Sequence, residues 1–375
     1  MKYFIIFLIV YMLCGCKTEE HREVAHVVVN KASESFFDAG KEFDSRHVVF
    51  LETTDKSLIG HVSKVVVANG KLYVFDKNTN SVVLFDKDGK FLSAIRPSGK
   101  GPGEYFSMAD FSFDRKRNQI FLLALGPGKI LVYDENGKFE YEMFYDNLGA
   151  GMAVVNDGLS IVSMNGEDKP YLNFIRYKDG KITDVVASDF KHHIASDLYT
   201  QGALIMQGEK VNFARRFDNT VYSIEEHNVV PRFYLDFGES NLPDRIMNLS
   251  TDEERQKKMK KGDYVYTMLN IKETANNFYM SVNKGGFVVL EKAKKEAVIY
   301  RCVADMDLGI KMGWVVGVED EKNENEHVQD RITEYTEKQA ASSMEIGEQQ
   351  AIVADAQAKI DQAQADLAEA KKKIQ

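Results

Sequence analysis

The sequence predicts an all-β protein, a β-propeller with six blades as the expected number, followed by a C-terminal α-helical tail. Two observations predict this fold. Short runs of β-branched and aromatic residues alternate with turn sequences from His47 to Arg301. Groups of four such runs recur with a period of roughly 38–45 residues, which is typical of repeat architectures. A β-sandwich would not give such even groups of four.

The composition is compatible with one large β-structure and excludes several other classes. Of the 375 residues, 44% are hydrophobic, so the chain is not wholly disordered. A net charge of −9 argues against a nucleic-acid partner held by a basic surface. Only three cysteines occur and two lie within the first sixteen residues, which excludes a disulfide framework.

Residues 1–16 are predicted to be a lipoprotein signal peptide. Lys2 precedes an apolar run, Tyr3–Leu13, that is shorter than the roughly 20 residues of a membrane-spanning helix. The sequence Leu13-Cys14-Gly15-Cys16 resembles the lipobox of bacterial lipoproteins, in which the last cysteine is acylated and begins the mature chain. We therefore expect Cys16 to carry the lipid; the alternative is a plain signal peptide with a coincidental cysteine.

Residues 17–45 are predicted to be a tether, since residues 21–44 show no clear period. Lys17-Thr18-Glu19-Glu20 resembles the surface-export signal of Bacteroidetes lipoproteins, and a solvated linker is the alternative. These features predict a lipid-anchored protein of the cell envelope. The outer membrane, on its periplasmic or surface face, is favoured over the inner membrane.

The predicted propeller spans residues 46–318, and its first blade is the clearest. Four strands are expected within residues 62–96, at Val62–Val67, Lys71–Phe75, Ser81–Phe85 and Phe91–Ile95. The Asn-Gly and Asp-Gly pairs between them supply the positive φ angles that tight hairpin turns need. Four antiparallel strands within about 35 residues make one propeller blade.

Four further blades are expected at residues 108–145, 151–190, 202–237 and 264–302, the fourth with a looser pattern. Residues 238–262 interrupt the rhythm. This segment is polar and rich in lysine, which predicts a helical insertion between the fourth and fifth blades.

Two motifs of the first blade resemble a known family. Val82–Phe91 contains Phe85-Asp86 followed by the turn Lys87-Asp88-Gly89-Lys90, and Gly99–Tyr105 reads Gly-Lys-Gly-Pro-Gly-Glu-Tyr. Together with Leu51–Gly60 they resemble the six-bladed β-propeller lipoproteins of Bacteroidetes, which are similar to propellers of the NHL type. The resemblance covers roughly residues 1–318. It implies a fold and a location but no activity, because most members have none assigned.

Closure of the ring needs a sixth blade. His47–Leu51 is the expected contributor, paired with strands from the C-terminal side. Relatives usually return to a last strand at the C-terminus, whereas this chain offers charged and Ala-rich sequence after Val318. The sixth blade is therefore expected to be incomplete, with residues 312–318 as its other part.

The tail, residues 319–375, has a helix-forming composition. Within residues 346–374, large apolar side chains recur every seven residues, with Ala356, Ala363 and Ala370 at the fourth position of the last three heptads. The large residues are Ile346, Val353, Ile360, Leu367 and Ile374. This pattern predicts a coiled coil, and hence a possible homo-oligomer; a single helix lying on the propeller is the alternative.

No motif in the sequence predicts a catalytic residue, a metal or a cofactor. The loop containing Gly99, Gly101, Pro102 and Gly103 leads to a strand rather than a helix, so it is interpreted as a structural crossover instead of a phosphate loop. The loop at Asp76 begins like a calcium site but lacks its glycine and final acid. His192 and His193 are adjacent and would face opposite ways on a strand.

A candidate ligand face follows from the propeller topology. Loops between the second and third strands open on the same face as the crossovers into the next blade. The candidate residues on these segments are Asp76, Asn78, Asn80, Arg96, Lys100, Glu104, Tyr105, His192, His193, Arg215 and Arg216. Their mixed charges and aromatic rings suit a polar ligand; the alternative is that they are ordinary solvated loop residues.

Two functions are compatible with this sequence. The first, which the missing catalytic motifs favour, is a membrane-anchored binding or scaffold module whose partner is a protein, a peptide or a glycan. The alternative is an extracytoplasmic lyase or hydrolase with its site at the channel mouth, because fold alone does not determine function.

Overall fold

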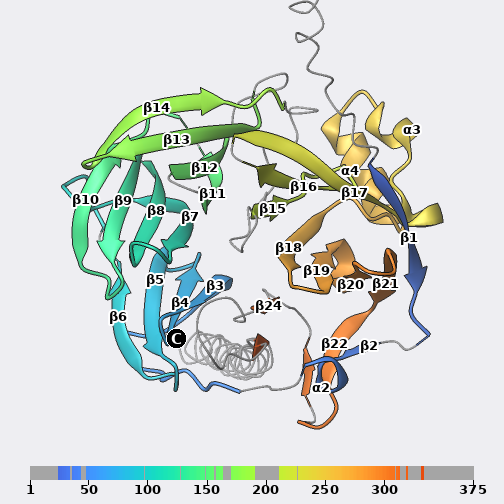
Figure 1. Ribbon diagram of the computed structural model, residues 1–375, viewed down its shortest axis with the longest axis horizontal. Coiled ribbons are helices and arrows are strands. Elements are labelled where there is room, and N and C mark those ends of the chain that lie inside the picture. Colours follow the sequence, from blue (N-terminus) through green and yellow to red (C-terminus); the bar gives the residue numbers. More distant parts are fainter. Residues whose placement is uncertain are drawn as a thin grey trace, which may run out of the picture.

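A computed structural model shows β-sheets arranged in a ring (Figure 1). It describes residues 24–33, 36–43, 48–96, 98–126, 128–147, 149–155, 158–163, 170–190, 211–225, 227–308, 310–312, 318–319 and 331–332. The all-β propeller class predicted from the sequence is confirmed. The predictions for the signal peptide, for Cys16 and for the coiled coil of residues 346–374 lie outside the described residues. No described helix is long and apolar enough to cross a membrane.

Three four-stranded antiparallel sheets form the first half of the ring. The first contains β3 (Val62–Ala68), β4 (Lys71–Asp76), β5 (Ser81–Asp86) and β6 (Phe91–Ile95). The second contains β7 (Ser107–Asp114), β8 (Gln119–Gly126), β9 (Lys129–Asp134) and β10 (Phe139–Phe144). The third contains β11 (Gly149–Val155), β12 (Gly158–Ser163), β13 (Leu172–Lys178) and β14 (Lys181–Ala187). These sheets match the first three predicted blades.

An eight-stranded sheet forms the next part of the ring. It contains β15 (Val211–Phe213), β16 (Thr220–Glu225) and β17 (Asn228–Asp236), then β18 (Met268–Glu273), β19 (Asn277–Val282), β20 (Gly286–Glu291) and β21 (Glu296–Tyr300). A strand from the N-terminus, β1 (Ala25–Lys31), lies between β17 and β21 and pairs in parallel with both (Figure 1). One strand thus joins the outer edges of two successive blades.

The predicted tether is wrong for the part of it that the structure describes. Besides β1, it contains β2 (Phe36–Asp38), which pairs in parallel with β22 (Cys302–Asp305), and the short helix α2 (Ala39–Glu42). The signal for β1 was weak because an outermost strand buries little: only Val27 of its seven residues is buried. The burial alternates from Ala25 to Asn30, but the apolar Val28 lies on the exposed side, so the apolar residues of the sequence do not alternate.

The last sheet differs from the prediction in its N-terminal contributor. It is three-stranded, with β22 between β2 and β23 (Ile310–Met312), and β24 (Val318–Glu319) pairs separately with β25 (Arg331–Ile332). The described part of His47–Leu51 is not a strand. Val49 and Leu51 instead pack against the first sheet beside Phe85, because the hydrogen-bonding partner that β22 needs is already supplied by β2.

The predicted helical insertion between the fourth and fifth blades is confirmed. It contains a 3-10 turn, η2 (Gly238–Ser240), and two helices, α3 (Asp244–Met247) and α4 (Asp252–Lys261). The hydroxyl of Thr251 accepts a hydrogen bond from the Glu254 N–H at 3.2 Å and caps α4. Ile246 of α3 and Met259 of α4 are buried.

A buried ion pair connects the first strands of the first three sheets. Lys64 of β3 donates to both carboxylate oxygens of Asp110 on β7, at 3.0 and 3.1 Å, and to the Phe111 carbonyl at 2.6 Å. The backbone N–H of Met152 on β11 donates to the same carboxylate at 2.9 Å. Both charged side chains are almost fully buried, so each charge is compensated by the other in place of water.

The crossover between the first two sheets is fixed by the second sheet. Gly103 has a φ of +74°, and a Cβ built there would lie 3.0 Å from the Phe139 ring. Glu142 accepts from the Gly103 N–H at 2.8 Å and from Lys129 at 2.7 Å, and the Tyr133 hydroxyl donates to the Gly103 carbonyl at 2.9 Å. The loop therefore has a structural role in joining two blades.

We expect Gly103→Val to lower the free energy of unfolding by about 1–3 kcal/mol, because it adds a clash to an unfavourable backbone angle. Gly70→Ala is the control: Gly70 has a φ of +68°, but an added Cβ meets nothing within 4 Å. Gly70→Ala should lower the free energy of unfolding by only about 1 kcal/mol. Thermal and denaturant unfolding measure both variants, and an unchanged melting temperature for Gly103→Val would disprove the structural role.

Two neighbouring valines of β1 provide a matched test of its place in the ring. Val27 is 2% exposed and Val28 is 59% exposed. Val27→Asp should lose at least about 2 kcal/mol of stability because it buries an unpaired charge, and Val28→Asp should change it by no more than about 0.5 kcal/mol. Equal melting temperatures for the two variants would show that β1 does not pack as described.

Candidate functional site

The predicted ligand face is built from loops whose polar side chains mostly bind their own backbone. Asp76, at the end of β4, is buried and accepts hydrogen bonds from the N–H groups of Gly60, His61 and Asn78 at 2.7, 3.0 and 2.9 Å. Burial acts to raise the pKa of Asp76, but the hydrogen bonds from the Gly60 N–H, the Thr79 hydroxyl and the His61 N–H lower it below its ordinary value. Asp76 therefore holds the loop before β3 and is not presented to a ligand.

Asn80 and Tyr105 likewise connect the first sheet to the second. Asn80 has a φ of +55°. Its side chain donates to the Phe106 carbonyl at 2.8 Å and accepts from the Met108 N–H at 2.7 Å. Tyr105 is 1% exposed, and its hydroxyl donates to the Asn80 carbonyl at 3.0 Å. Burial raises the pKa of Tyr105, in agreement with a structural role.

Arg96 and Glu104 also contact nearby backbone groups. A terminal nitrogen of Arg96 donates to the Leu58 carbonyl at 3.1 Å. The Glu104 carboxylate accepts a hydrogen bond from the Gly101 N–H at 2.9 Å, which closes the Gly101-Pro102-Gly103 turn. Asn78 is exposed, and its side chain packs beside Gly60. Arg96, Glu104 and Asn78 therefore contribute to the shape of this face more than to its ligand-binding groups.

Lys100 and Phe106 are the groups that the same crossover presents to solvent. Phe106 is 54% exposed, and the Lys100 ammonium lies 5.9 Å from the centre of its ring. A cation beside an aromatic ring makes a cation–π contact. This pair is a candidate contact point for a ligand.

Arg215 belongs to a buried cluster in the loop between β15 and β16. Its Nε donates to Asp218 at 2.9 Å, and its guanidinium lies 4.3 Å from the centre of the Phe190 ring. The Tyr222 hydroxyl donates to the same Asp218 oxygen at 2.6 Å. Burial and the Asp218 charge raise the pKa of Tyr222 to about 12, so the phenol remains a donor at neutral pH.

Arg216, the next residue, lies beside two aromatic rings. Its guanidinium is 4.6 Å from the centre of the Phe217 ring and 5.5 Å from that of Tyr266. Phe217 has a φ of +65°, a conformation that bulky residues rarely adopt. Its N–H donates to the Tyr266 carbonyl at 2.8 Å, which ties this loop to the segment that enters β18.

The backbone around Tyr266 is also bound by the turn between β19 and β20. Asn283, in the turn between β19 and β20, accepts from the N–H groups of Tyr266 and Thr267 at 2.8 and 3.2 Å. Its amide nitrogen donates to the Tyr264 carbonyl at 2.7 Å. The rings beside Arg216 are therefore positioned by rigid backbone, and the site needs no ligand to assemble it.

The remaining predicted positions do not add to this site. His192 and His193 lie outside the described residues. In the described part of the chain, no three histidine, cysteine or acidic side chains are grouped so that they could hold a metal ion. The aromatic partners Phe106, Phe190, Phe217 and Tyr266 were missed as site residues. The sequence Phe-Ala-Arg-Arg-Phe at residues 213–217 could have indicated them, since aromatic residues flank the arginine pair.

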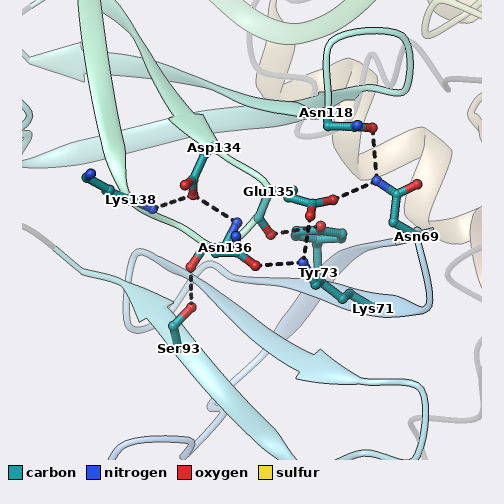
Figure 2. Close-up of polar contacts among 9 residues, drawn as sticks. All are labelled: Asn69, Lys71, Tyr73, Ser93, Asn118, Asp134, Glu135, Asn136 and Lys138. Carbon is teal, nitrogen blue, oxygen red and sulfur yellow. Dashed lines mark hydrogen bonds and ion pairs between the residues drawn. The ribbon is translucent and has the colours of Figure 1, made fainter.

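The opposite face carries a polar network that joins the turns of the first two sheets (Figure 2). Asn69 donates to Asn118 and Glu135 at 2.9 and 2.7 Å, and Lys71 pairs with Glu135 at 3.2 Å. Hydrogen bonds from Asn69 and Lys71 lower the pKa of Glu135. The Tyr73 hydroxyl donates to the Glu135 carbonyl at 3.0 Å. Since its donors and acceptors satisfy one another, this network serves to connect the blades.

Comparison with solved structures identifies similar folds. A protein of Bacteroides fragilis NCTC 9343 described as exported superposes with a TM-score of 0.61 at 21% sequence identity, over 74% of this chain and 80% of that one. The WD40 repeats of RRP9 give a TM-score of 0.44 at 14% identity, over 72% and 71% of the two chains. BamB from Moraxella catarrhalis gives a TM-score of 0.39 at 8% sequence identity, over 64% of each of the two chains.

The first of these comparisons supports the propeller fold, and at such identity it supports the fold alone. No curated protein sequence matches this chain. A family model does match, over residues 26–357, a range that includes β1 from its second residue onward and every sheet of the ring. The chain belongs to this family, which is described as a domain of unknown function, DUF4934.

Proposed function

We propose that this protein is a lipid-anchored, extracytoplasmic propeller that binds a polar ligand or a partner through the face bearing Lys100 and Arg216. The observation that carries the proposal is that two loops held by hydrogen bonds each carry a cation–aromatic group, Lys100 with Phe106 and Arg216 with Phe217 and Tyr266. Mixed cationic and aromatic surfaces of this kind suit polar ligands that also have apolar faces.

The proposed location rests on the sequence and on one structural likeness. The segment ending at Cys16 has the features of a lipoprotein signal, and the similar Bacteroides structure is of a protein described as exported. The proposal includes a six-bladed ring of the Bacteroidetes lipoprotein type and an outer-membrane destination. β1 begins nine residues after Cys16, a distance of at most about 30 Å for an extended chain. The propeller would therefore remain close to the membrane.

Cys16→Ser should release the protein from the membrane, because the thiol that accepts the lipid is lost. The measurement is the fraction of full-length protein that sediments with membranes, in wild type and variant. Cys14→Ser is the control and should still sediment. If Cys16→Ser sediments as wild type does, the anchor is elsewhere.

Binding should depend on the proposed face and not on the opposite one. We expect Phe106→Ser to weaken binding to whichever members of a panel of polysaccharides and peptides the mature chain retains, as measured by biolayer interferometry. Lys116→Gln, on the turn between β7 and β8, should bind as wild type does. The proposal fails if no panel member binds, or if Lys116→Gln is the variant that loses binding.

A further inference from the structure

The second helix of the insertion, α4, presents four lysine side chains on one side. All four are exposed: Lys257, Lys258, Lys260 and Lys261. Because successive residues of an α-helix are turned by about 100°, these lysines span an arc of about 160° around the helix. Met259, which is 3% exposed, lies opposite the middle of that arc. The buried methionine therefore holds α4 with its lysine side toward solvent.

The lysine side of α4 is not used to hold the fold together. None of its four ammonium groups has a hydrogen bond or an ion pair with another described residue. Lysines in the last turn of a helix favour its dipole, but Lys257 lies outside that turn. The chain as a whole carries a net charge of −9, so this cluster is a local reversal of its charge.

The insertion is joined to β1, the first strand after the predicted lipid anchor. Val27 of β1, Phe237 before the insertion and Val265 after it belong to one buried cluster. The ring of His26 stacks on that of Tyr234, with centres 4.6 Å apart. β1 and the two helices consequently lie on the same side of the ring (Figure 1).

Asp236 and Asp244 show the same proximity through their charges. Hydrogen bonds from the Gly238 N–H and the Asn241 side chain, together with the nearby His26, lower the pKa of Asp236. Burial and the charges of Asp236 and Asp244 raise the pKa of Tyr234, the residue on which His26 stacks. Asp244 is the first residue of α3, so the helices begin within electrostatic reach of the residues that pair with β1.

The short segment before β1 decides which anionic partner the lysines can meet. Nine residues separate Cys16 from Ala25, a reach of at most about 30 Å. A lipid on Cys16 would lie in the bilayer, so the side of the propeller that carries β1 and α4 would stay near its surface. Attraction between exposed charges is screened beyond about 10 Å, and a tether this short brings the lysines into that range.

We propose that the lysine side of α4 is a membrane-contact surface, which binds the headgroups of anionic phospholipids and orients the anchored propeller on the bilayer. Ammonium groups on flexible stems need no fixed geometry in a partner, which suits a fluid layer of phosphates. The net charge of the chain disfavours approach by other sides. This inference rests on the lipid anchor of the proposed function.

The test attaches the full mature chain to vesicles through an N-terminal hexahistidine tag and a nickel-chelating lipid, in place of its own lipid. The vesicles consist of phosphatidylcholine, alone or with about 30% phosphatidylglycerol as the anionic lipid. A water-soluble acetylating reagent and mass spectrometry measure the modification rate of each lysine. Phosphatidylglycerol should slow modification of the four α4 lysines at least about fivefold, and salt at about 0.5 M should abolish the difference.

Matched variants test whether the charge of α4 is responsible. Lys260→Gln combined with Lys261→Gln should restore most of the modification rate at Lys257 and Lys258, whereas the corresponding pair of arginine substitutions should keep it slow. The control pair is Lys178→Gln with Lys181→Gln, two exposed lysines paired across the hairpin of β13 and β14 on the other side of the ring (Figure 1). This pair should leave the rates in α4 as in wild type.

Two results would overturn the proposal. Equal rates in α4 on the two kinds of vesicle would show that the lysines do not meet the lipid. Slowing that is equal at Lys178 and Lys181 would show a general effect of the surface instead of a contact through α4. Because the tag replaces the lipid, neither result depends on acylation of Cys16, which the sedimentation of Cys16→Ser tests separately. The circular dichroism spectrum of each variant confirms that it is folded.

Discussion

The structure depends on one constraint: each sheet of a ring must be tied to its neighbour, because a twisted sheet with an open edge is neither stable nor protected from aggregation. Three kinds of tie meet this need. The Lys64–Asp110 pair and the Met152 N–H connect the first strands of three sheets. β1 pairs with the outer strands of the next two blades, and β2 brings the N-terminal segment to β22.

These ties explain why most polar residues of the predicted ligand face are not available to a ligand. Asp76, Asn80 and Tyr105 each bond to backbone of a neighbouring strand or crossover. The loops they hold are consequently rigid, and rigid loops can present a few side chains in fixed positions. Lys100 with Phe106, and Arg216 with Phe217 and Tyr266, are the cation–aromatic groups presented in this way.

The sequence predicted those parts of the fold whose partners are close along the chain. Hairpins with Asn-Gly and Asp-Gly turns are local, so the first three sheets and the helical insertion were found with nearly correct bounds. β1 and β2 were missed because their parallel partners lie far away along the chain, and because the exposed Val28 interrupts the apolar–polar alternation of β1. For the site, the sequence placed Asp76 and Tyr105 in the correct segments but not the direction of their side chains, which is set by Gly60 and His61 for Asp76 and by Asn80 for Tyr105.

The most direct test of this account is hydrogen exchange of the backbone amides of Ala25–Lys31 in the intact mature protein, compared with those of β17 and β21. If β1 is part of the ring, its amides that pair with these strands will be protected, and their protection will be lost together with that of both neighbours on partial denaturation. Exchange of residues 25–31 at the rate of an unstructured chain, with β17 and β21 still protected, would contradict the account.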